Sequence, residues 1–167
     1  MALSRSLLPE FDFEMANTRK VLERVPEEQF DWKPHSKSMS FREIATHLAN
    51  IPTWAVRSIN RDSFDMSPPG EAPPRAAPVK SSAELLETFD RNVVAAREAI
   101  SGASDEHLRE KWSLLSGGKT VMTLSRVAVL RSFFMNHSIH HRGQLSVYLR
   151  LQDIPVPALY GPSADES

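Results

Sequence analysis

Two histidines four residues apart lie on what is otherwise the apolar face of a predicted helix. His137 and His141 fall within FFMNHSIHHRGQLSVYLR, residues 133–150, in line with Phe134 and Leu145. On a helix, the Cβ atoms of such a pair are about 6 Å apart. Zinc–nitrogen bonds of about 2.1 Å at a tetrahedral angle require the two nitrogens to lie about 3.4 Å apart. The spacing therefore allows both imidazoles to bind one metal ion.

A third histidine, His47, lies on the apolar face of another predicted helix, together with Leu48 and Ile51. An imidazole from a neighbouring helix would complete a set of three ligands and leave coordination positions open for water or substrate. Three neutral imidazoles buried without an ion would instead leave several hydrogen-bonding groups unpaired. The sequence therefore predicts a divalent metal site formed by His47, His137 and His141. The alternative is that these histidines form a polar network in the core of a structural homodimer.

Other polar and aromatic residues near the histidines allow two interpretations each. Gln144 and Asn50 could bind an imidazole and fix its tautomer, or could be ordinary polar residues between helices. Arg142 could bind an anionic group or pair with a carboxylate near the C-terminal segment. The large aromatic residues could line a pocket or cap the core: Trp32, Trp54, Trp112 and Tyr160.

The sequence contains no other recognised catalytic pattern. It has no cysteine, which excludes disulfides and thiolate ligands or nucleophiles from the chain itself. A Ser-His-Asp order, a P-loop and a dinucleotide fingerprint are all missing. Ser138 follows His137 where a zincin motif has glutamate. No Asp or Glu stands out on the inward faces of the two histidine-bearing helices, so no catalytic residue is assigned.

Four segments with helical periodicity position the histidines. They cover residues 3–24, residues 40–55, residues 81–102, and a last segment that begins near Thr123 or Ser125 and runs through Tyr148. Two capping boxes are predicted at helix starts, one pairing Ser40 with Glu43 and the other pairing Ser81 with Glu84. Pro52 is expected to kink the second helix just after His47.

The connections between these helices are long. Residues 61–80 contain five of the twelve prolines and predict a crossover loop. Residues 103–122 are irregular and could form a short hairpin over Gly117–Gly118. The tail, residues 152–167, contains three prolines and predicts an extended strap. With no internal repeat, the sequence predicts one domain over residues 1–167, an all-α four-helix bundle with long crossover connections.

The composition excludes several classes of partner. The 167 residues are 41% hydrophobic and 25% charged, with a formal net charge of −1. This balance argues against a nucleic-acid-binding protein. No apolar run approaches the roughly 18 residues of a membrane span, and acidic residues interrupt MALSRSLLPEFDFEM, residues 1–15, too early for a signal peptide. We therefore expect a cytoplasmic protein that acts on a small molecule, with neither nucleic acid nor membrane as its partner.

Three motifs in this order resemble the DinB-like family of metalloenzymes. They are FDWKPHSKSMSFREIATHLANIP at 30–52, NHSIHHRGQLSVYLR at 136–150 and IPVPALYGPSADE at 154–166. The resemblance extends over essentially the whole chain. It implies a four-helix bundle with crossover connections, a homodimer, and a divalent ion held by His47, His137 and His141. His140 belongs to the family's HHRGQ string but is not expected to bind the ion.

The resemblance also implies classes of reaction. Related members include thiol-dependent transferases, which use a metal-bound low-molecular-weight thiol, and a thiol-dependent maleylpyruvate isomerase. We therefore expect a metal-dependent transferase or hydrolase in which zinc or nickel activates a bound thiol or water. Transferase is ranked slightly ahead on the resemblance alone. The alternative is a non-catalytic stress protein that binds a metal or a small ligand.

Overall fold

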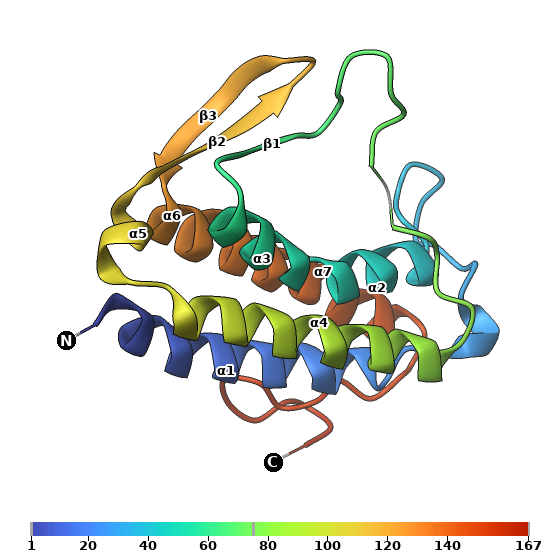
Figure 1. The fold of residues 1–167 in the computed structure, drawn as a ribbon. Coiled ribbons are helices and arrows are strands. Elements are labelled where there is room, and N and C mark those ends of the chain that lie inside the picture. Colours follow the sequence, from blue (N-terminus) through green and yellow to red (C-terminus); the bar gives the residue numbers. More distant parts are fainter. Residues whose placement is uncertain (1, 75, 167) are drawn as a thin grey trace.

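Five helices of nine or more residues make up a little under half of the structure, a computed structural model that describes residues 2–74 and 76–166. Figure 1 shows α1 and α4 side by side beneath α2, α3 and α7. Among them, α1 packs on α4 and α7, and α2 packs on the same two helices. The bounds are α1 (Leu3–Leu22), α2 (Phe41–Asn50), α3 (Pro52–Asn60), α4 (Ser82–Gly102) and α7 (Asn136–Leu151).

The mainly helical character predicted from the sequence is confirmed. The shorter helical elements are the 3-10 turn η1 (Glu27–Gln29), α5 (Asp105–Arg109), α6 (Arg126–Ala128) and the π-helical segment η2 (Val129–Met135). The four-helix bundle with crossover connections stays an interpretation of the helix packing. No helix among residues 2–74 and 76–166 has the length and the apolar character needed to cross a membrane.

The capping box at the start of α2 is confirmed in full. Ser40 Oγ accepts a hydrogen bond from Glu43 N, and Glu43 Oε2 accepts one from Ser40 N at 2.7 Å. At α4 only half of the predicted box forms. Ser81 Oγ accepts from Glu84 N, but the Glu84 carboxylate binds Lys80 N instead of Ser81 N. Both helices therefore begin where their side chains pair the free N–H groups of the first turn.

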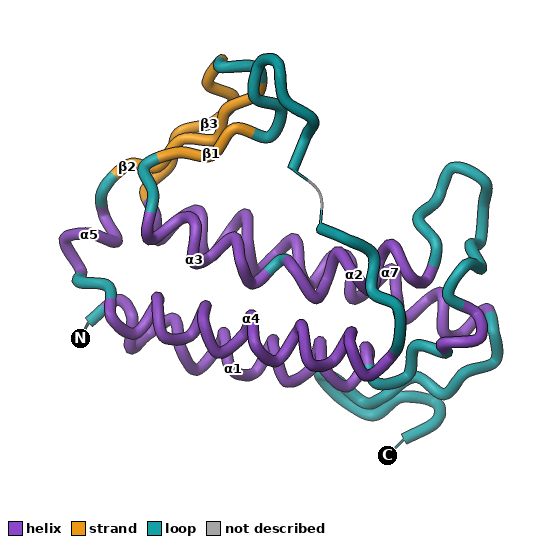
Figure 2. The backbone as a smooth tube through the Cα atoms, turned by 45° about the vertical axis from the view of Figure 1, so that its right-hand side comes forward, coloured by secondary structure: helices purple, strands orange, loops and turns teal. Residues whose placement is uncertain are grey.

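Pro52 divides the second predicted helix in two. The helix α2 ends at Asn50, and Pro52 is the first residue of α3, a position where its missing N–H removes no helical hydrogen bond. Ile51 between them keeps helical dihedral angles, with φ −53° and ψ −39°. The chain therefore continues from α2 into α3 along the same side of the molecule (Figure 2).

The last predicted helix begins at Arg126, with Ser125 as its N-cap, close to the predicted start, and it contains a wide turn. The chain is extended up to Ser125, after which α6 leads into the π-helical segment η2 (Val129–Met135) and then α7. π-helical turns are rare and are found often at functional sites. Here the turn ends two residues before His137, so it sets the direction in which the histidine-bearing helix leaves the sheet.

A three-stranded sheet makes the all-α prediction wrong. Its order is β1 (Ser63–Asp65), β2 (Lys111–Ser116) and β3 (Lys119–Ser125), with β1 parallel to β2 and β2 antiparallel to β3. The hairpin over Gly117–Gly118 forms at positive φ angles of 61° and 75°, as a two-residue turn requires. The strand β1 was not predicted, because it is three residues long and pairs with a strand about 50 residues away.

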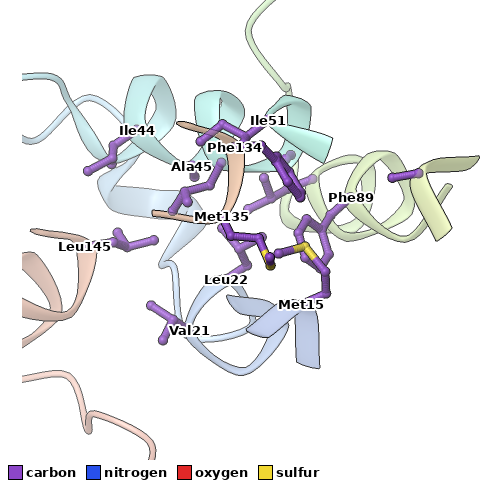
Figure 3. Close-up of a cluster of buried hydrophobic side chains, with 14 of the residues drawn as sticks. Met15, Val21, Leu22, Ile44, Ala45, Ile51, Phe89, Phe134, Met135 and Leu145 are labelled. Atoms are coloured by element: carbon purple, nitrogen blue, oxygen red, sulfur yellow. The ribbon is translucent and has the colours of Figure 1, made fainter. Parts of the chain in front are cut away.

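One apolar cluster fills the space between the helices (Figure 3). Met15 of α1, Ile44 of α2, Phe89 of α4 and Leu145 of α7 are all buried in it, and Phe134 of η2 is fully buried. A second, smaller cluster joins Trp112 and Leu114 of β2 to Val129 of η2. The sheet therefore has its own apolar support beside the main core.

The C-terminal segment after α7 contains neither helix nor strand over residues 154–166. Ion pairs hold it to α7 and to the turn after α1, with Arg150 paired to Asp165 and Arg24 paired to Glu166. The predicted strap at residues 152–167 and the single domain over residues 1–167 stay predictions.

Candidate metal site

The three predicted ligands lie together on two elements. His47 projects from α2, and His137 and His141 project from α7. His137 Nε2 lies 3.0 Å from His47 Nε2 and 3.0 Å from His141 Nε2. One ligand atom from each ring lies within 4.8 Å of the others, so the group could hold a metal ion. Their assignment as ligands stays a prediction.

The spacing of the nitrogens fits a shared ion. Two nitrogens bound to one ion at about 2.1 Å lie about 3.0 Å apart at a right angle and about 3.4 Å apart at a tetrahedral angle. Both observed distances of 3.0 Å match the right-angle arrangement. Three imidazole ligands leave the remaining coordination positions of the ion for other groups.

Hydrogen bonds alone cannot satisfy these nitrogens. His141 Nδ1 donates to Gln144 Oε1 at 2.7 Å, so Nε2 of a neutral His141 ring carries a lone pair. His137 Nε2 then has at most one proton to share between His141 and His47. At most one of the two close contacts is therefore a full hydrogen bond. A cation would accept a lone pair from all three rings.

The electrostatics of the site keep the rings neutral. Burial lowers the pKa of His47 and of His137 to about 4, with the neighbouring His141 contributing in each case. Burial also lowers the pKa of His141, partly opposed by its hydrogen bond to Gln144. At neutral pH each ring therefore has one nitrogen without a proton, and the three imidazoles carry no charge.

Of the two polar residues considered as imidazole partners, the structure places only one beside a ring. Gln144 binds His141, three positions away on α7. Asn50 Nδ2 instead donates to Thr46 O on its own helix. His140 is exposed and stands outside the cluster, although its ring centre is 5.0 Å from that of His141. The structure therefore separates the two adjacent histidines into one buried and one exposed ring.

Aromatic side chains close one side of the site. The Trp54 ring of α3 lies 4.8 Å from His137 and 5.7 Å from His47, measured between ring centres. Phe133 of η2 stacks on Trp54 at 5.4 Å with an interplanar angle of 20°. These rings shield the imidazoles from water on that side.

A cavity of about 580 Å³ opens beside His47. Besides His47 and Trp54, its wall includes Glu43, Asn50 and Arg57. We call it the histidine cavity. Sequence reasoning missed Glu43 and Arg57 as site residues. A signal for them exists, since the five positions follow one another at steps of 4, 3, 4 and 3, which is one face of a helix.

The other candidates lie away from the histidines. Arg142 is buried and pairs with the Glu14 carboxylate at 2.7 Å, which also accepts a hydrogen bond from the Tyr160 hydroxyl. Arg142 therefore joins α7 to α1 and to the C-terminal segment, as the carboxylate interpretation expected. Trp32 packs against Phe41 and Tyr148 and so belongs to the core.

Comparisons with known proteins agree with this fold. YrdA of Bacillus subtilis (strain 168) is 27% identical over 161 residues, which covers 95% of this chain and 89% of YrdA. The crystal structure of the DinB-like protein YjoA from Bacillus subtilis matches with a TM-score of 0.70 and 17% identity, over 95% of this chain and 99% of that chain. The crystal structure of a DinB-like protein from Bacillus cereus ATCC 10987 matches with a TM-score of 0.70 and 20% identity, over 92% of this chain and 95% of that chain.

The family model agrees with the three motifs. The model that describes the DinB family matches residues 2–167. The resemblance seen in the sequence is confirmed, and this chain belongs to the DinB family.

Proposed function

We propose that this protein is a metal-dependent enzyme that acts on a small molecule at a divalent ion held by His47, His137 and His141. The observation that supports this most is the contact of three neutral Nε2 atoms, which hydrogen bonds cannot satisfy. Zinc and nickel are the first candidates for the ion, because both accept imidazole ligands. The proposal includes a cytoplasmic homodimer that binds neither nucleic acid nor membrane.

The chain's residues prepare this site for chemistry. When bound by three uncharged ligands, a divalent ion lowers the pKa of a bound water or thiol and polarises an oxygen of the substrate. Gln144 holds the His141 ring with Nε2 directed to the cluster. Trp54 and Phe133 exclude water from one side. The histidine cavity beside His47 gives a substrate room to approach the cluster.

Two classes of reaction fit this arrangement. A thiol-dependent transferase, with a low-molecular-weight thiol as co-substrate, needs no carboxylate from the protein. A hydrolase needs a general base, and Glu43 supplies a carboxylate in the wall of the histidine cavity. Its Oε2 is already bound to Ser40 N. We therefore place transferase first and hydrolase second.

A screen with and without thiol separates these reactions. Metal-free protein is reconstituted with zinc or nickel and assayed on electrophilic substrates with glutathione, bacillithiol or mycothiol, and on ester substrates without thiol. The transferase proposal expects turnover that needs both metal and thiol and survives in Glu43→Gln. Turnover without thiol that Glu43→Gln abolishes would establish the hydrolase. Metal binding without turnover in any arm would favour the non-catalytic binder.

A further inference from the structure

A second cavity, of about 230 Å³, lies between α3 and the sheet. Its wall includes Trp54 and Arg57 of α3, Phe64 of β1, Trp112 of β2 and Phe133 of η2. We call it the aromatic cavity. Four of these five residues are aromatic, and they come from elements far apart in the sequence. The cavity therefore depends on the sheet that the all-α prediction did not contain.

The aromatic cavity adjoins the histidine cavity. Trp54, Arg57 and Pro74 line both of them. Trp54 also contacts His137, with 4.8 Å between the ring centres. A molecule in the aromatic cavity therefore lies beside the wall that carries His47.

Arg57 brings a charge to this shared wall that no carboxylate balances. Among residues 2–74 and 76–166, no Asp or Glu oxygen pairs with its guanidinium, which lies 4.8 Å over the Phe64 ring. Burial and the nearby Arg61 lower the pKa of Arg57. The fully buried arginines differ, because Arg126 pairs with a carboxylate and so does Arg142. A half-buried cation without a counter-charge favours the binding of an anion.

Trp112 offers a hydrogen-bond donor in the same wall. The side chain is 3% exposed, and its Nε1–H has no partner in the part of the chain that the structure describes. Buried donors are rarely left without an acceptor. The indole N–H is a donor only, so the missing partner must be an acceptor. A small shift of the indole toward the aromatic cavity would let an oxygen of a bound molecule supply it.

We propose that the aromatic cavity binds the ring of a small aromatic carboxylate, whose carboxylate pairs with Arg57 and accepts a hydrogen bond from Trp112. A dry cavity of about 150 Å³ holds benzene, so about 230 Å³ has room for one ring with a small substituent. Aromatic walls favour a flat ring. The ligand's role as the substrate rests on the proposed function, whereas its binding does not.

Benzoate tests this proposal against benzamide, which has the same shape but no charge. Both are titrated by calorimetry and by tryptophan fluorescence, in metal-free and in metal-loaded protein. We expect benzoate to bind about tenfold more tightly than benzamide or better, because a charged hydrogen bond is lost with the amide. Arg57→Gln should lower the affinity for benzoate by a similar factor. Arg61→Gln is the matched control and should change it by less than threefold, since Arg61 does not line the cavity.

The outcomes separate the cavity from the metal site. Equal affinity for benzoate and benzamide, no binding of either, or an unchanged affinity in folded Arg57→Gln would overturn the proposal. The comparison of the two ligands on the wild-type protein decides the matter if Arg57→Gln does not fold. Benzoate binding in a protein that takes up no metal would leave the cavity standing and refute the proposed function. Metal uptake without benzoate binding would refute the proposed aromatic cavity site and leave the proposed function standing.

Discussion

The substitution Glu14→Gln should destabilise the protein far more than its position on a surface helix suggests. Glu14 is 5% exposed and Arg142 is 2% exposed, and their side chains form an ion pair at 2.7 Å. Removing one partner of a buried pair leaves the other charge without compensation, which costs about 3–5 kcal/mol. Glutamine keeps the size and one acceptor for Tyr160, so we expect a loss near the lower limit.

The magnitude translates into a change that a melting experiment resolves. For a chain of this size, 1 kcal/mol shifts the melting temperature by about 2–4 °C. A loss of about 3 kcal/mol therefore lowers the melting temperature of Glu14→Gln by about 6–12 °C. The assay is thermal unfolding followed by circular dichroism, with urea unfolding as a second measure of the free energy.

A matched control lies on the same helix. Glu10 pairs with Arg131 at 3.1 Å, but these side chains are 39% and 46% exposed. An exposed pair contributes at most about 1 kcal/mol, so Glu10→Gln should lower the melting temperature by no more than about 4 °C. If Glu14→Gln and Glu10→Gln had the same effect, the argument from the buried charge would be refuted.

Two further predictions concern the histidines. The free energy of unfolding of the metal-free protein should fall as the pH drops from about 6.5 to 4. His47 and His137 have a pKa of about 4 in the folded protein and 6.5 in the unfolded chain. The unfolded chain therefore takes up protons first, which favours unfolding. Urea unfolding at pH 7 and pH 5 measures this, and equal stability at both would contradict the burial of the rings. Gln144→Leu should weaken zinc binding by about 10–100-fold, because His141 loses the acceptor that orients its ring. Competition with a zinc chelator measures the affinity. Gln144→Glu is expected to retain more of the affinity than Gln144→Leu. An unchanged affinity in Gln144→Leu would show that the hydrogen bond between Gln144 and His141 is not needed.

The helix faces that carry the histidines could be predicted because they depend on local periodicity. His137 and His141 share one face by their spacing alone, and His47 shares a face with Ile44 and Leu48. Helical spacing is set by bonds within a few residues of the chain. The same local reasoning found the cap at Ser40, which the structure confirms.

The sheet could not be predicted in full because its contacts are long-range. The strand β1 is three residues long, follows no clear alternation, and pairs in parallel with β2. The Asp65 carboxylate accepts hydrogen bonds from Gly117 N and Gly118 N, about 50 residues away. Only the hairpin itself carried a local signal, in its two glycines. The aromatic cavity was hidden for the same reason, since the sheet supplies part of its wall.

The metal content of untagged protein tests the central claim most directly. Elemental analysis of purified wild type should find close to one divalent ion for each chain, and His140→Ala should keep it, because that exposed ring lies outside the cluster. His47→Ala and His137→Ala should each retain far less than one ion, while circular dichroism shows that they remain helical. A wild-type protein with far less than one ion per chain, and with no difference from His137→Ala, would contradict the account.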